Sequence, residues 1–250
     1  MDNIHTFSQE PGRYARHRPV YPRELFELLN TLAQGHAAVW DCATGSGQAA
    51  LACADFFERV EATDLSLEQL RHAAPHPRVR YQVCRAEQAP FANESFDLLS
   101  VALALHWFDL KQFYAEARRV LKPGGLLAAW GYGFFSIQPE IDSLISRDLF
   151  EPLDPFWAQG NRLLMAGYRD LPLPFDEITG LPEFVIRLDW NLEQLLAYLR
   201  TWSAVKRYVA EVGSDPVSRL ENSLKALWES PAEVKLVQMP LFLKVGRRPA

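Results

Sequence analysis

Apolar residues recur along the chain with two different periods, and the alternation between them predicts the fold. Short apolar runs predict strands, and stretches with apolar residues every three or four positions predict helices. The predicted strands of the first half cover residues 37–42, 60–64, 79–84, 96–102 and 126–130. Helices are predicted between them, among others at 49–57 and 109–121. Strands that alternate with helices favour a parallel sheet with right-handed crossovers.

The amino-acid composition of the chain changes after Gly133. Residues 134–182 are rich in proline and aromatic residues and are too long for a plain connection, which predicts a cap or lid. Further strands are predicted at 184–190 and 234–246, with a bulge or an edge at Pro240, because proline deletes a ladder hydrogen bond. The predicted domains are an N-terminal lid segment and helix, a ligand-binding core, and the C-terminal half of the sheet with an inserted helical cap, over 1–34, 35–133 and 134–250.

Composition narrows the class of protein. With 250 residues and 48% apolar content, the chain is long enough to bury a core. Its net charge of −5 argues against a general nucleic-acid binder, which usually presents a basic face. We expect a cytoplasmic protein without a membrane segment, because no apolar run approaches the length of a bilayer span and no signal peptide is evident. The cysteines show no metal-binding spacing, so we expect core thiols and no metal site: Cys42, Cys53 and Cys84.

One turn carries the clearest chemical signal. The first predicted strand ends in Asp41, and a small-residue turn with Gly45 and Gly47 leads into an apolar run of helical length. Glycines let a ligand lie against bare backbone, and the first N–H groups of the following helix face that ligand. The second strand ends in Asp64, which is placed to accept both hydroxyls of a ribose. The pattern indicates a ligand of the adenosine type and disfavours one with a 2′-phosphate.

Two such ligands have to be distinguished. NAD sites favour three glycines, and here Ala50 stands in the third position, which that pattern tolerates. Asp41, however, is a poor neighbour for a pyrophosphate and suits a ligand with a cationic amino-acid end. This argument favours S-adenosylmethionine. The alternatives are an NAD-dependent oxidoreductase and a non-catalytic protein of the same fold that binds the cofactor.

The segment from Asp41 to Gly47 resembles the D-x-G-x-G-x-G motif of class I S-adenosylmethionine-dependent methyltransferases, of the type 11 group. Later landmarks follow in family order: Asp64-Leu65-Ser66, Ala86-Glu87 with Pro90-Phe91, Ser95-Phe96-Asp97, and Arg119 to Gly125. The resemblance implies a Rossmann-like, doubly wound α/β fold with a mostly parallel sheet of about seven strands, the last antiparallel, and a helical cap. One departure is Ala43, which replaces the first motif glycine and would be strained at a positive φ.

The resemblance also implies residue roles. Asp41 would lie near the methionyl ammonium and Asp64 would hold the ribose. Further cofactor contacts are implied for Ala43, Thr44, Gly45, Gly47, Leu65, Ala86, Glu87 and Ala102.

The segment His106-Trp107-Phe108-Asp109 is similar to a narrower branch related to trans-aconitate methyltransferases, as are the upstream and downstream segments Tyr14 to Pro22 and Thr201-Trp202-Ser203. That branch methylates small carboxylic acids. We therefore expect a small-molecule acceptor, with no nucleic-acid or membrane partner, in a monomer or homodimer. Candidate acceptor contacts are Tyr14, Arg18, Tyr21, Trp107 and Trp202.

The role of His106 stays open at this stage. A carboxylate acceptor is already ionised at neutral pH and needs no base, whereas a phenol, amine or carbon acid needs one, and His106 is the histidine that a motif places to act. A packing or orienting role is the alternative. A cationic side chain could bind an acceptor carboxylate through two hydrogen bonds. Each candidate is more simply explained as a solvated surface charge: Arg162, Arg169, Arg187, Lys206 and Arg207.

Overall fold

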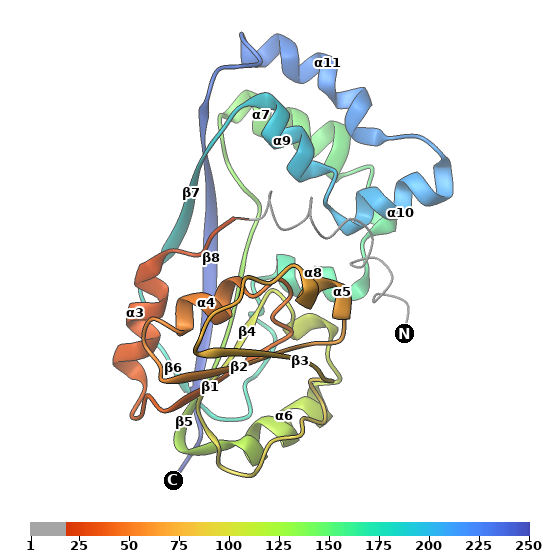
Figure 1. Cartoon of the computed structure of the whole chain (residues 1–250). Helices are drawn as coiled ribbons and strands as arrows, with labels where there is room; N and C mark the ends of the chain where they lie inside the picture. The colour runs from red at the N-terminus through yellow and green to blue at the C-terminus, as the bar shows by residue number, and fades with distance from the viewer. Residues whose placement is uncertain (1–18) are drawn as a thin grey trace.

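The computed structural model describes residues 19–250, and it contains the predicted parallel sheet (Figure 1). Five parallel strands form it in the order β3-β2-β1-β4-β5. Their bounds are Ala38–Cys42 for β1, Arg59–Asp64 for β2, Val79–Val83 for β3, Phe96–Ala102 for β4 and Leu121–Tyr132 for β5. Asp41 and Asp64 therefore reach the same edge of the sheet from neighbouring strands, as predicted.

The antiparallel part of the sheet is built on one long strand, β8 (Lys235–Arg247). It pairs with β5 on one side and with two shorter strands on the other, β6 (Asp176–Ile178) and β7 (Phe184–Trp190). Over residues 19–250 the sheet thus has eight strands, in agreement with the expected number of about seven, and β6 and β7 pair with successive parts of β8. The predicted α/β class and the antiparallel last strand are confirmed.

Pro240 sits in β8 without the expected bulge. The pairing with β7 is continuous through Val185↔Pro240, and the last pair with β5 is Tyr132↔Leu241. The Pro240 carbonyl accepts from Gly133 N–H, on the side where β5 has just ended. Pro240 therefore lies where the regular pairing of β8 with β5 stops. This position resembles a sheet edge, where a residue without a backbone N–H is tolerated.

Helices cover both faces of the sheet (Figure 1). One face carries α3 (Arg23–Leu32), α4 (Gln48–Cys53) and α5 (Leu67–Arg71), and the other carries α6 (Leu110–Val120). The helix expected over 49–57 ends at Cys53, and turns lead from there to the buried Phe57. Three helices begin with a side chain that accepts from the backbone N–H group three residues on: Ser66 from Gln69, Asp109 from Gln112 and Asn191 from Gln194.

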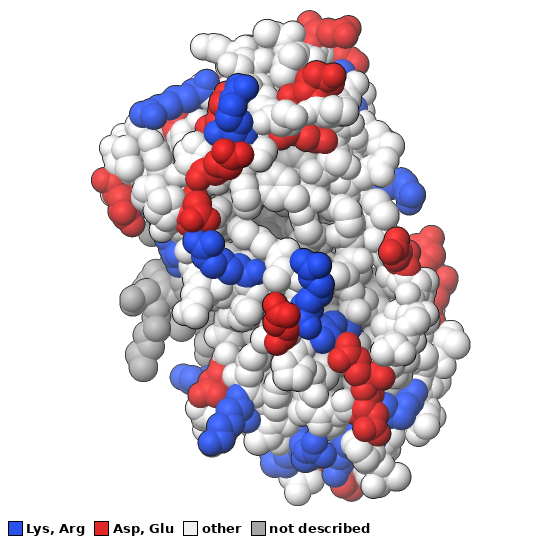
Figure 2. All heavy atoms as spheres, turned by 180° about the vertical axis from the view of Figure 1, so that it is seen from behind, with Lys and Arg blue, Asp and Glu red and all other residues white. Residues whose placement is uncertain are grey.

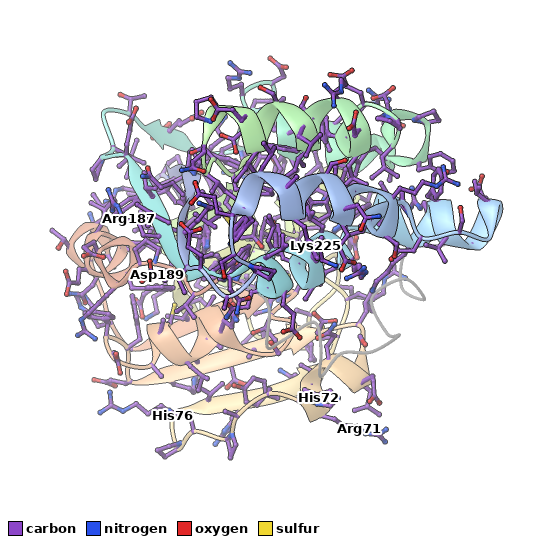
Figure 3. The ribbon with its side chains drawn as sticks, turned by 90° about the horizontal axis from the view of Figure 1, so that it is seen from above. Arg71, His72, His76, Arg187, Asp189 and Lys225 are labelled. Carbon is purple, nitrogen blue, oxygen red and sulfur yellow. The ribbon has the colours of Figure 1, made fainter. Side chains whose placement is uncertain are left out.

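A helical cap stands beyond the carboxyl edge of the sheet, joined to it by the long strands β7 and β8 (Figure 1). It consists of α7 (Pro139–Ile145), the π-helical turn η2 (Ser146–Phe150), the 3₁₀ turn η3 (Asp154–Phe156), α9 (Leu192–Leu199), α10 (Ser203–Val212) and α11 (Pro216–Trp228). One apolar core runs without a break from α3 and α4 into these helices. In the view from above, Lys225 of α11 lies near the middle of the molecule, and His72 and His76 lie at its lower border (Figure 3).

Part of the segment predicted as cap belongs to the other face of the sheet. Tyr168, Leu171 and Phe175 are buried together with Phe113 of α6, and Leu163 and Leu164 of α8 (Gln159–Met165) pack against the same cluster. The chain thus leaves the cap after η3, covers the second face, and enters β6.

The described surface has mixed charge. On the face shown in Figure 2, basic and acidic side chains are interspersed over the core and the cap, unlike the basic stripe typical of nucleic-acid-binding domains. Within residues 19–250, no helix is both long and apolar enough to cross a membrane.

Candidate active site

The carboxylate of Asp41 is buried at the end of β1. It is 1% exposed, and it accepts hydrogen bonds from the hydroxyls of Thr44 at 2.5 Å and Ser100 at 2.7 Å. Burial raises the pKa of Asp41 to about 6 despite these two donors. No cation within residues 19–250 forms an ion pair with this buried acid, and a positively charged ligand group would supply one.

Asp64 ends β2 beside the same turn. Its two oxygens accept from the backbone N–H groups of Gly45, at 2.9 Å, and Ser66, at 2.8 Å. Each carboxylate oxygen retains a further lone pair for a ligand hydroxyl. Desolvation raises the pKa of Asp64 as well.

The two glycines of the turn are required for different reasons. Gly45 has φ +58° and faces open space, because a Cβ built there meets no atom within 4 Å. Gly47 has φ +85°, and a Cβ there would lie 2.5 Å from the Tyr81 hydroxyl oxygen. Gly45 thus keeps the ligand side of the turn clear, and Gly47 lets β3 pack behind it.

Ala43 takes the left-handed conformation that its motif position demands, with φ 56°. A methyl group is unfavourable there by roughly 1–2 kcal/mol, part of which glycine loses again through its greater freedom in the unfolded chain. We therefore expect Ala43→Gly to raise the free energy of unfolding by about 1 kcal/mol in urea denaturation.

A matched control is Glu94→Gly, at an exposed loop residue with φ 53°. It should change stability on a similar scale, offset by its exposed ion pair with Arg248. Only Ala43→Gly should also alter affinity for S-adenosylhomocysteine. An unchanged or lowered stability of Ala43→Gly would show that the residue is not strained.

The loop expected to flank an adenine is fixed by α6. Glu116 accepts from Ala89 N–H at 2.7 Å and pairs with Arg119 at 2.6 Å. Arg119 in turn donates to the carbonyls of Phe91 and Ala89. Glu87 accepts from the Asp109 N–H, so its carboxylate helps to tie the loop to the start of α6.

Two other landmark residues lie at the opposite end of the sheet and have structural contacts. Asp97 is buried, accepts from Ala38 N–H and pairs with Lys122 at 2.7 Å. These contacts join the starts of β1, β4 and β5.

A cavity of about 570 Å³ lies between the carboxyl edge of the sheet and the cap. Leu103, directly after β4, and Gly133, directly after β5, line its sheet side. Leu103 has φ 55°, a strained conformation for a bulky residue of the kind that clusters at functional sites. The cavity therefore begins where these two strands end.

His106 lies on the cavity wall, on the 3₁₀ turn η1 (Leu105–Trp107) after β4. It is 8% exposed, and its Nδ1 is 2.7 Å from the hydroxyl of Tyr168. Tyr168 is buried in the left-handed region at φ 55°, and desolvation raises the pKa of its phenol well above the usual value. A protonated tyrosine thus holds one nitrogen of the imidazole and fixes the ring.

The structure brings His106, Trp107 and Trp202 together around this cavity. Trp202, whose spacing favours core packing, is half-buried and lines the cavity. Tyr21 packs instead edge-on against Trp130 of β5, with ring centroids 5.7 Å apart. Tyr14 and Arg18 lie outside the described residues.

Most of the residues that line the cavity do not belong to a recognisable sequence motif. The aromatic content of 134–182 pointed to Phe134, Phe150 and Trp157 only as a group, and nothing in the sequence singled out Tyr168 as the partner of His106. Among residues 19–250, no group of three or more His, Cys, Asp and Glu side chains is arranged to hold a metal ion.

The fold and the site define an α/β protein with a nucleotide-type turn, two acids at neighbouring strand tips and a capped cavity beside them. Residues 40–129 match the methyltransferase domain family. A solved structure described as a type II methyltransferase from Anaeromyxobacter dehalogenans is 40% identical, covers 93% of this chain and 98% of its own, and superposes with a TM-score of 0.85. The chain belongs to the class I S-adenosylmethionine-dependent methyltransferases, and its cofactor is S-adenosylmethionine.

Two further comparisons concern a curated relative and a structure that shares the fold. A Dictyostelium discoideum protein described as a methyltransferase is 26% identical over 246 residues, covering 94% of this chain and 92% of its own. The YcgJ structure from Bacillus subtilis, 18% identical with a TM-score of 0.53 over 92% of this chain and 100% of its own, shares the fold. The oxidoreductase alternative receives no support from these relatives.

Proposed function

We propose that the chain transfers the methyl group of S-adenosylmethionine to a small molecule bound in the cavity between sheet and cap. The observation that carries this proposal is the position of the cavity. It is lined by Leu103 and Gly133, the residues that directly follow β4 and β5, at the carboxyl edge where ligands of doubly wound sheets bind.

The residues present fit the cofactor. Asp41 offers a buried carboxylate to the methionyl ammonium, and Asp64 offers two oxygens to the ribose hydroxyls. Bare backbone for close approach comes from the turn at Thr44 and Gly45, with Ala43 and Gly47 on either side. Leu65, Ala86, Glu87 and Ala102 complete the proposed cofactor contacts.

When bound, S-adenosylmethionine supplies an electrophilic methyl group on a sulfonium. The protein then contributes alignment, exclusion of water and, where the acceptor is protonated, a base. The cavity and its cap provide the first two. The acceptor decides whether the third is needed, since a carboxylate requires no base and a hydroxyl does.

Calorimetry and methyl-transfer assays test the proposal. We expect S-adenosylhomocysteine to bind at one site per chain and NAD not to bind. Incubation with radiolabelled cofactor and small-molecule acceptors should label an acceptor rather than the protein. Failure to bind S-adenosylhomocysteine would contradict the proposal, as would labelling of macromolecular acceptors alone.

The proposed contact of Asp41 predicts a pH dependence of cofactor binding. Burial raises the pKa of Asp41 from its ordinary value of 3.8 to about 6. In the ligand-free protein the protonated side chain therefore contributes to the free energy of unfolding, and this contribution is fully present below pH 3.8 and is lost as pH rises through about 6. A cationic ligand reverses this preference. Affinity for S-adenosylhomocysteine should therefore rise about tenfold between pH 5 and pH 7 in calorimetric titrations.

The Asp41→Asn variant supplies the control for this titration. It keeps the shape of the side chain but cannot ionise, so its affinity should be lower at pH 7 and change less with pH. An equal pH dependence in both proteins would remove Asp41 from the ammonium site.

A further inference from the structure

The cap side of the cavity is an aromatic wall. Six rings line it: Phe134, Phe135, Phe150, Trp157, Tyr198 and Trp202. Trp202 contacts the other five, with ring centroids 5.5–6.5 Å away. Such a wall favours flat ligands, which gain from stacked and edge-to-face contacts.

The charge of the wall argues against an anionic acceptor. Among residues 19–250, the cavity lining contains no lysine or arginine, and its carboxylate, Asp142, would repel an acid. Burial raises the pKa of Asp142, which indicates a poorly solvated setting. An acceptor carboxylate would be desolvated here without a cation from the described wall, which is costly.

The cationic side chains of the cap segment make other contacts. Arg162 pairs with Asp154 at 3.1 Å, Arg169 donates to the Ala166 carbonyl, and both are exposed. Arg187 is exposed on β7, at the outer edge of the molecule (Figure 3). Each is therefore placed as a surface charge.

The cavity lining also contains uncharged polar side chains, among them Asn161 and Thr201, so a ligand bound here can form hydrogen bonds. His106 presents its ring at the sheet side of the cavity.

We propose that the acceptor is an uncharged aromatic compound methylated on a phenolic hydroxyl, with His106 as the base. This inference rests on the methyltransferase function proposed above. In the reaction, the phenolic oxygen bonds to the methyl carbon as the carbon–sulfur bond breaks and its electron pair goes to sulfur. This step requires the imidazole tautomer in which Nδ1–H donates to the Tyr168 oxygen. Nε2 of His106 then accepts the hydroxyl proton and releases it to solvent.

The test compares 2-naphthol with 2-naphthoate, two probes that share a ring system and differ in the group to be methylated. Binding is measured by calorimetry at pH 7.5 on protein saturated with S-adenosylhomocysteine, and methyl transfer is measured with S-adenosylmethionine. We expect 2-naphthol to bind at least tenfold more tightly than 2-naphthoate and to be the one methylated. Tighter binding of 2-naphthoate, or binding of neither probe, would overturn the inference.

A charge-introducing variant locates the binding. Met165 lines the cavity and is 40% exposed, so Met165→Lys can be accommodated at the rim. It should raise affinity for 2-naphthoate about tenfold, whereas Arg187→Met on the outer edge should change neither affinity. If Met165→Lys alters neither probe, the aromatic ligand does not occupy this cavity and the inference fails. Binding of S-adenosylhomocysteine is measured first. A protein that does not bind it would contradict the methyltransferase proposal itself, and this outcome is distinct from failure of the proposed acceptor to bind.

Discussion

Replacing Asp64 by alanine is expected to weaken binding of S-adenosylhomocysteine by about 100-fold, because two hydrogen bonds from ribose hydroxyls to a carboxylate are lost. The carboxylate also accepts from Gly45 and Ser66 N–H groups, which hold the turn beside the ligand. Asp64→Asn keeps one acceptor oxygen and should lose about tenfold. Calorimetric titration of the three proteins gives the affinities directly.

The fold should tolerate these changes at Asp64. Burial raises its pKa, so near neutral pH the ionised side chain does not contribute to the stability of the ligand-free protein through its charge. A control for general destabilisation is Asn191→Ala, which removes the cap of α9 far from the turn and should cost about 1 kcal/mol of stability without loss of affinity. Unchanged affinity in Asp64→Ala would remove Asp64 from the ribose site.

Local signals in the sequence were sufficient for the parallel half of the sheet. Strand periodicity, capping residues and the glycine turn act over a few neighbouring positions, as the helix caps Ser66, Asp109 and Asn191 show. The tips of β1 and β2 follow from the same logic, since neighbouring parallel strands end at one edge. This is why Asp41 and Asp64 could be placed together before their contacts were known.

The cavity could not be predicted in the same way, because its wall is assembled from segments far apart in the chain. Phe150 of η2, Trp157 after η3 and Trp202 before α10 meet only through packing of the cap. Nor does any short-range pattern bring Tyr168 to His106, 62 residues away. Nor did the apolar residues of segment 159–175 indicate that part of it packs against the second face of the sheet.

Because His106 is hydrogen-bonded to Tyr168, mutations of these two residues can distinguish a packing role of His106 from a role as a base. A histidine that only packs would tolerate an isosteric polar replacement, whereas a base would not. His106→Asn retains a group near Nδ1 that can meet the Tyr168 hydroxyl, but it has no basic nitrogen. Tyr168→Phe keeps the ring that packs in the second face and removes the hydroxyl that orients the imidazole.

For a phenolic acceptor, His106→Asn is expected to lower kcat by about 100- to 1,000-fold at pH 7.5, with affinity for S-adenosylhomocysteine unchanged, since general base catalysis typically contributes 10²–10⁴-fold. Because phenols ionise near pH 10, the loss should shrink steadily as pH rises toward that value, where the acceptor no longer needs a base. Tyr168→Phe should give a smaller loss, about tenfold, and a shifted pH–rate profile, as expected of a positioning residue. These rates are measured with 2-naphthol across pH 6.5–10. A deficit in His106→Asn that stays constant over this range would exclude base catalysis, because a purely structural defect has no reason to disappear when the acceptor ionises.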